Sequence, residues 1–136
     1  MPRFNCAELP PCPDLSFESP LWAAGLARVG GLDEAGRGAW AGPVTAGAVL
    51  LPTCCPDLAG RLRGVRDSKQ MTARQREFWA AVIRAEAAAW GVGFAWREEV
   101  DRLGVLGATR LAMRRALEAL PALPEHLLLD ALRLPG

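Results

Sequence analysis

The chain has 136 residues, of which 51% are hydrophobic, and 16 basic and 15 acidic residues give it a formal net charge of +1. This length suits one globular domain and is too short for two of ordinary size. The near-neutral balance excludes a strongly cationic protein that binds nucleic acid over its whole surface, so any such contact must be local.

Neither export nor membrane anchoring is indicated. Residues 1–15 contain prolines and carboxylates instead of a basic start and an apolar run, so we expect a flexible leader and not a signal peptide. The uncharged stretch 38–56 is interrupted by glycines and prolines, which favours buried sheet over a membrane helix. The four cysteines lack zinc-ligand spacing and are expected to be reduced thiols. We therefore expect a cytoplasmic protein whose ordered domain covers 16–136.

The first half of the chain predicts a short helix followed by two strands. Ser19 as N-cap and Pro20 in the first turn favour a helix over 19–26. Residues 27–33 predict a strand whose two glycines indicate close approach of backbone or ligand. Residues 44–51 are rich in strand-forming residues and predict a second strand. The two strands are expected to form a well-buried, hairpin-like pair.

The second half predicts the order helix, strand, helix, strand. Thr72 and Gln75 form a capping box for a helix with an apolar face of Phe78, Val82 and Ile83. A strand over 90–95 and a long helix follow. The apolar face of that helix is predicted to contain Val105, Ala108, Ala112, Ala116 and Leu120. A last strand over 126–130 completes a strand, helix, strand crossover, which implies parallel strands and a mixed α/β sheet flanked by helices.

Two adjacent carboxylates, Asp33 and Glu34, follow the first apolar strand. They could simply begin a solvated turn, which is the usual fate of such a pair. Side chains alternate across a regular strand, so both can reach one site only if the strand ends or bulges between them. Carboxylates that share a site repel one another unless a cation bridges them, and Mg²⁺ or Mn²⁺ prefers oxygen ligands. This pattern predicts a metal site.

A Gly36-Arg37-Gly38 turn comes directly after the carboxylates. Because glycines have no side chain to keep a ligand away, their backbone N–H groups can approach it closely. The alternative is a plain turn without a ligand.

Several other residues are weaker candidates for function. His126 has no histidine or cysteine partner in the sequence, which favours a structural role. Glu98, Glu99 and Asp101 are expected to form a solvated helix start. The tryptophans could stack on bases, but burial is the expectation for Trp40, Trp79, Trp90 and Trp96.

The segment over 31–44, GLDEAGRGAWAGPV, resembles the signature of the ribonuclease HII family. The resemblance continues in Asp67-Ser68-Lys69, in GVGFAWREEVDRLGVLGATRLAMRRAL over 91–117, and in the aliphatic strand that ends at Asp130. It covers the chain from about residue 16 onward, and so long and ordered a match is far more specific than a lone glycine motif. It implies the ribonuclease H fold, with the strand of Asp33 beside the strand of Asp130.

The resemblance also implies an activity and a set of site residues. Asp33, Glu34 and Asp130 would be catalytic and would bind two Mn²⁺ or Mg²⁺ ions for phosphodiester hydrolysis. The implied substrates are RNA/DNA hybrids and DNA duplexes with an embedded ribonucleotide. The backbone of Gly36, Arg37 and Gly38 would read the 2′-hydroxyl, and Ser68 and Lys69 would contact phosphate. An ordinary loop with Ser68 as a local helix cap is the alternative for that last pair.

The family pattern has a fourth acidic residue beyond the strand of Asp130, and a tyrosine at the RNA–DNA junction. This sequence ends at Gly136 and contains no tyrosine, so we expect an incomplete catalytic domain, acting as a monomer. Two alternatives remain open. One is an inactive remnant that binds nucleic acid or metal without turnover. The other is a metal-dependent member of the same fold that acts on DNA.

Overall fold

The structure, a computed structural model, describes residues 12–37 and 42–130. Its helices and strands in chain order are α1 (Glu18–Ala23), β1 (Val29–Ala35), β2 (Val44–Leu50), α2 (Leu58–Arg61), the 3-10 helix η2 (Ser68–Gln70), α3 (Ala73–Glu86), β3 (Ala89–Ala95), α4 (Arg97–Glu118) and β4 (His126–Leu129). The predicted strands lie within two residues of the observed ones. The first helix begins at Glu18 and not after Ser19, because the backbone already turns where the Ser19 N–H donates to the Leu15 carbonyl.

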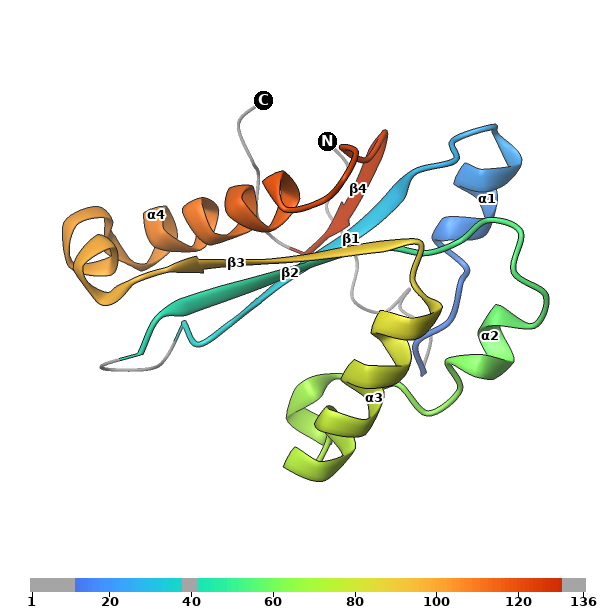
Figure 1. The fold of residues 1–136 in the computed structure, drawn as a ribbon, viewed down its shortest axis with the longest axis horizontal. Helices are drawn as coiled ribbons and strands as arrows, with labels where there is room; N and C mark the ends of the chain where they lie inside the picture. The colour runs from blue at the N-terminus through green and yellow to red at the C-terminus, as the bar shows by residue number, and fades with distance from the viewer. Residues whose placement is uncertain (1–11, 38–41, 131–136) are drawn as a thin grey trace.

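The four strands of the described residues form one mixed sheet in the order β3-β2-β1-β4 (Figure 1). Strand β2 is antiparallel to both β1 and β3, whereas β4 is parallel to β1. Helix α4 crosses from β3 at one edge to β4 at the other. The hairpin, the parallel crossover and the mixed α/β sheet predicted from the sequence are therefore confirmed.

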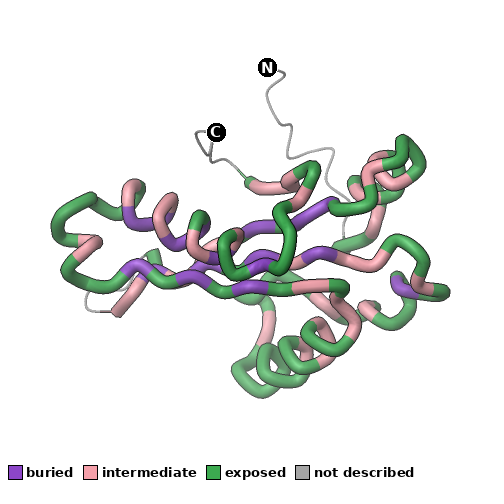
Figure 2. The backbone as a smooth tube through the Cα atoms, turned by 45° about the horizontal axis from the view of Figure 1, so that its top comes forward, coloured by how far each residue is buried: buried purple, intermediate pink, exposed green. Residues whose placement is uncertain are grey.

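Helix α4 covers one face of the sheet and forms the core with it (Figure 2). Gly91 and Gly93 of β3 allow close approach, because a Cβ at either position would collide with the carbonyl oxygen of Ala116 or Ala112. The sheet contributes five buried side chains to this contact: Leu32, Val44, Ala46, Ala48 and Leu50. Helix α4 contributes Ala108, Ala112, Met113 and Ala116. Val105 was predicted in this face but is 41% exposed, because Gly104 (φ 74°) interrupts the helix just before it.

The opposite face of β3 presents apolar side chains to solvent. These are Trp90, Val92 and Phe94, with Trp96 directly after the strand, and their exposed fractions are 44%, 41%, 39% and 55%. The expected burial of Trp90 and Trp96 is thus wrong: strand alternation directs them away from α4, while the glycines face it. Trp40 lies outside the described residues. Phe94 and Trp96 stack on each other with ring centroids 5.5 Å apart.

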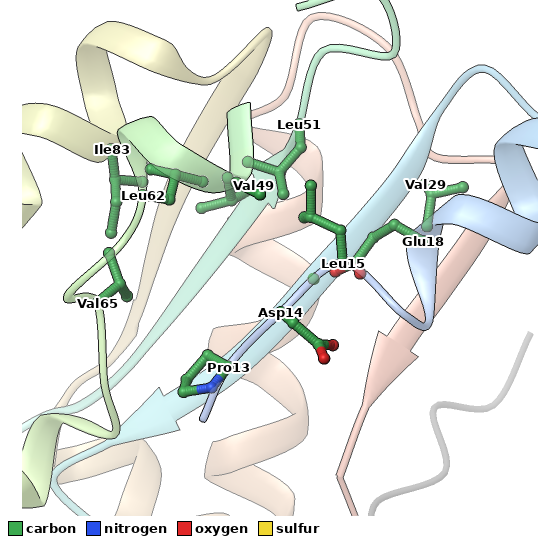
Figure 3. A pocket seen from close by; sticks show the side chains of 12 residues that line it. Pro13, Asp14, Leu15, Glu18, Val29, Val49, Leu51, Leu62, Val65 and Ile83 are labelled. Carbon is green, nitrogen blue, oxygen red and sulfur yellow. The ribbon is translucent and has the colours of Figure 1, made fainter. Parts of the chain in front are cut away.

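The same side of the sheet carries an apolar hollow of about 270 Å³ between β1, β2, the α2 region and α3 (Figure 3). Leu15, Val49, Leu51, Leu62 and Ile83 contribute to its wall. Helix α3 has the predicted capping box, with Thr72 Oγ1 accepting from Gln75 N and Gln75 Oε1 accepting from Thr72 N. Its predicted apolar face is not buried: Phe78 is 62% exposed, because α3 projects from the sheet instead of lying along it (Figure 1).

Cys12, Cys54 and Cys55 are free thiols, and Cys6 lies outside the described residues. None of the helices in the described ranges has the length and apolar character needed to cross a membrane.

Candidate active site

Carboxylates from two neighbouring strands come together where the parallel β1–β4 ladder ends. Leu32 of β1 and Leu129 of β4 are partners in the parallel ladder, and the next residue on each strand is acidic: Asp33 and Asp130. Both line a pocket of about 460 Å³, together with Glu34. The structure therefore brings the three acidic residues proposed from the sequence to one place.

Strand β1 neither ends nor bulges between Asp33 and Glu34, contrary to the expectation from strand alternation. Asp33, Glu34 and Ala35 continue in regular register with β2. Both carboxylates nevertheless line the pocket. Strand β4 stops at Leu129, so the last residues of β1 have no neighbour on that side among the described residues. Side chains from both faces of β1 can bend around this open edge into one space.

The electrostatics of the pocket are dominated by the crowding of negative charge. Burial raises the pKa of the Asp33 carboxyl, and the nearby Glu34 and Asp130 raise it further, against a hydrogen bond from the Glu34 N–H at 2.8 Å. Glu34 is compensated locally, because Arg37 Nη1 lies 3.2 Å from Glu34 Oε1. The carboxylates of Asp33 and Asp130 have no such cation partner in the described part of the chain.

The donor set suits a hard divalent cation, since the acidic residues that line the pocket supply only oxygen ligands. In residues 12–37 and 42–130, however, no group of three or more His, Cys, Asp or Glu side chains is arranged so that it could hold a metal ion. The carboxylates share a pocket without converging on one point. Their oxygen ligands are nevertheless of the kind that a divalent ion prefers.

The turn after the carboxylates depends on Gly36. Its φ is +85°, a conformation that side chains disfavour, and an added Cβ would lie 2.8 Å from the Pro43 carbonyl oxygen. The conformation of this turn therefore requires Gly36, independently of any contact with a ligand. Arg37 lines the acidic pocket, and Gly38 lies outside the described residues.

The Asp67-Ser68-Lys69 segment also lines the acidic pocket. It forms the 3-10 helix η2, capped by Asp67, whose Oδ1 accepts from the Lys69 N–H at 2.9 Å. The alternative of Ser68 as the cap is therefore wrong by one residue. The pocket adds Asp67 and Leu106 to the residues expected from the sequence. Asp67 could have been found as an acidic N-cap before a short helix, whereas nothing in the sequence pointed to Leu106.

The acidic start of α4 is not simply solvated. Arg115 donates to both carboxylate oxygens of Glu99 at 2.6 and 2.7 Å, and also to the Phe94 carbonyl. The hydrogen bonds from Arg115 lower the pKa of Glu99 to about 2. Glu98 and Asp101 are exposed, as expected. The pair Glu99–Arg115 ties the start of α4 to its last turns and to β3.

Comparison with known proteins gives a consistent result. The family model described as Ribonuclease HII matches residues 30–136. Proteins named Ribonuclease HII from Moorella thermoacetica and Chloroflexus aurantiacus are 49% and 50% identical over 121 and 127 residues, which is 89% and 91% of this chain. The matches cover 56% and 58% of those proteins, so the chain spans little more than half of their length.

Among solved structures, the ribonuclease H2 of Pyrococcus horikoshii OT3 superposes with a TM-score of 0.63 at 28% identity, over 78% of this chain and 52% of that one. The likeness confirms the ribonuclease H-like α/β fold that the sequence resemblance implied.

Proposed function

The chain belongs to the ribonuclease HII family, and we propose that residues 16–136 form the part of an endoribonuclease domain that holds most of its catalytic carboxylates. The substrates would be RNA/DNA hybrids, whose RNA strand is hydrolysed, and DNA duplexes with an embedded ribonucleotide. The observation that carries this proposal is the shared pocket of Asp33, Glu34 and Asp130 where the β1–β4 ladder ends.

In this proposal, Asp33, Glu34 and Asp130 hold two Mg²⁺ or Mn²⁺ ions. When bound, such ions activate water and stabilise the leaving oxygen in phosphodiester hydrolysis. The raised pKa of Asp33 supports a role in cation binding, because a cation relieves the repulsion from Glu34 and Asp130. Arg37 holds Glu34 in the pocket in the absence of a substrate.

Selection of ribose would come from the turn after β1. The backbone N–H groups of Gly36, Arg37 and Gly38 would contact the 2′-hydroxyl, the group that distinguishes RNA from DNA. Ser68 and Lys69, on the other wall of the pocket, would contact a phosphate of the same strand. Asp67 supports them by holding the η2 turn through its bond to the Lys69 N–H.

The second candidate is a binding remnant without turnover. It is favoured by the absence, within the described ranges, of three acidic side chains arranged to hold a metal ion. If the protein is a nuclease, a fourth carboxylate from further chain would complete its metal site. If it is a binding remnant, no such carboxylate would restore turnover.

The deciding experiment incubates the chain with a DNA duplex containing one ribonucleotide, with an RNA/DNA hybrid and with an all-DNA duplex, in Mg²⁺ and then in Mn²⁺. Asp33→Asn is the test variant, and Asp101→Asn, an exposed carboxylate of α4, is the matched control. Cutting beside the ribonucleotide by the natural chain and by Asp101→Asn, but not by Asp33→Asn, supports the nuclease. Binding of the duplexes without cutting supports the remnant, and equal cutting of all-DNA duplex contradicts selection of ribose.

A further inference from the structure

Besides the acidic pocket and the apolar hollow of Figure 3, the surface has a further pocket of about 270 Å³ beside the η2 turn, called the second pocket below. It is lined by Gly64, Arg66, Gln70, Met71, Gln75 and Trp79. We propose that it binds a phosphodiester group of the nucleic-acid strand whose cleavage site occupies the acidic pocket. This inference rests on the proposed function, because it extends the same substrate surface.

The polar groups of the second pocket are predominantly donors. In the described part of the chain, the guanidinium of Arg66 and the side-chain amide of Gln70 have no hydrogen-bond or ion-pair partner. Gln75 accepts the Thr72 N–H through Oε1 at 2.9 Å, which leaves its amide nitrogen available as a donor. No carboxylate lines this pocket. One fixed positive charge with two amide donors and no acidic neighbour in the wall matches an anion.

Contacts between α3 and the η2 region hold the wall of the pocket in place. The Trp79 ring packs against Gly64, where an added Cβ would lie 2.7 Å from Trp79 Cζ2. Arg76 donates from Nη1 to the carbonyls of Ser68 and Met71 at 3.3 and 2.7 Å, which ties α3 to the η2 turn. The Trp79 indole supplies an apolar wall beside these polar groups, and Arg66 is exposed to solvent.

The η2 segment divides its side chains between the two pockets. Asp67, Ser68 and Lys69 line the acidic pocket, whereas Arg66, Gln70 and Met71 line the second one. A strand that lies over this turn can therefore meet both pockets. The sequence concentrates charge here: residues 61–76 contain six of the 16 basic residues, and Asp67 is the only acidic one. This stretch supplies the local basic surface that the overall charge of +1 conceals.

The experiment measures the equilibrium affinity of the chain for a short RNA/DNA hybrid in Ca²⁺, over a series of salt concentrations. Arg66→Gln is the test variant, and Arg114→Gln is the matched control, since Arg114 is an exposed arginine of α4 on the opposite face of the sheet. We expect Arg66→Gln to raise Kd about tenfold and to reduce the slope of log K against log salt by about 1. Arg114→Gln is expected to leave Kd within about twofold of the natural chain.

Two further variants separate charge from shape. Arg66→Lys keeps the charge and is expected to retain the salt slope, whereas Gln70→Leu removes a neutral donor and is expected to weaken binding without changing the slope. Equal affinities and slopes for Arg66→Gln and Arg114→Gln would overturn the inference, as would a failure of the natural chain to bind the hybrid. Because binding is measured without turnover, a chain that binds through Arg66 but never cuts refutes the proposed nuclease and leaves this site standing. If the natural chain cuts normally and Arg66→Gln leaves Kd unchanged, the nuclease is supported and this second site is refuted.

Discussion

Asp33 and Asp130 occupy equivalent positions in the sheet, each one residue beyond the Leu32–Leu129 pair of the parallel β1–β4 ladder. Their carboxylates line the same pocket as Glu34. Among the described residues, Arg37 is the only cation that forms an ion pair with any of these three carboxylates, and its partner is Glu34. The folded protein therefore keeps Asp33 and Asp130 in one pocket without a cation partner among the described residues, and the pKa of Asp33 is raised there.

Asp33→Asn should abolish cleavage and make the metal-free protein more stable. An acid whose pKa is raised in the folded state binds more protons there than in the unfolded chain, so folding stability falls as pH rises above its ordinary value of 3.8. Substitution removes that cost, and we expect the melting temperature at pH 7 to rise by about 1–3 °C. Below about pH 3.8 the carboxyl is protonated in both states, so the gain should vanish. A lower melting temperature at pH 7 would contradict the crowding of charge.

Arg115→Met should destabilise the protein at neutral pH by removing the partner of Glu99 and the bond to the Phe94 carbonyl. The pKa of Glu99 is lowered from 4.5 to about 2, so the ion pair stabilises the fold above pH 4.5, and this contribution is lost as pH falls toward 2. Thermal melts of the two proteins should therefore converge in acid. Arg114→Met, an exposed neighbour, serves as the control and should melt like the natural chain at every pH.

Gly93→Ala should weaken the contact between β3 and α4. The new Cβ would collide with the Ala112 carbonyl oxygen and the Ala116 nitrogen, both backbone atoms that cannot rotate away. We expect a loss of about 1–3 kcal/mol in the free energy of unfolding, measured in urea. Gly47→Ala is the matched control, because Gly47 lies on the opposite face of the same sheet with no atom within 4 Å of the added Cβ. An equal loss in both variants would show that strand propensity, and not close approach, decides the result.

Gly36→Ala should strain the turn that follows the carboxylates. The φ of +85° costs about 1–2 kcal/mol for a residue with a side chain. The contact with the Pro43 carbonyl adds to this. We expect a lower melting temperature together with reduced preference for the ribonucleotide in the cleavage assay. Gly31→Ala, which has open space around its added Cβ, is expected to change neither measurement.

Much of the fold could be predicted from local signals. The capping box of Thr72 and Gln75 marked the start of α3, and short apolar runs without charge marked the three antiparallel strands. The proximity of Asp33 to Asp130 could not be predicted in this way, because it depends on a parallel pairing between distant segments. Only the family resemblance implied it.

Prediction failed where burial was assigned to large apolar residues without knowledge of which surfaces other elements cover. Trp90, Trp96 and Phe78 are large and apolar, yet they lie on surfaces that no element of the described residues covers. Large residues and glycines alternate along β3 in the sequence, but this pattern alone does not say against which face of the strand α4 packs. The glycines at 91 and 93 were the available signal, since only small residues tolerate such close approach by a helix.

The pairing of β1 with β4 also determines when the site can form during folding. The hydrogen bond from the Arg28 N–H to Glu125, at the entry to this pairing, joins residues 97 positions apart, whereas the β1–β2 hairpin closes locally. Closing so long a loop is slower and entropically more costly than forming a hairpin. The acidic pocket can therefore form only after β4 has joined β1, whereas Asp33 and Glu34 can already lie on the β1–β2 hairpin before that step.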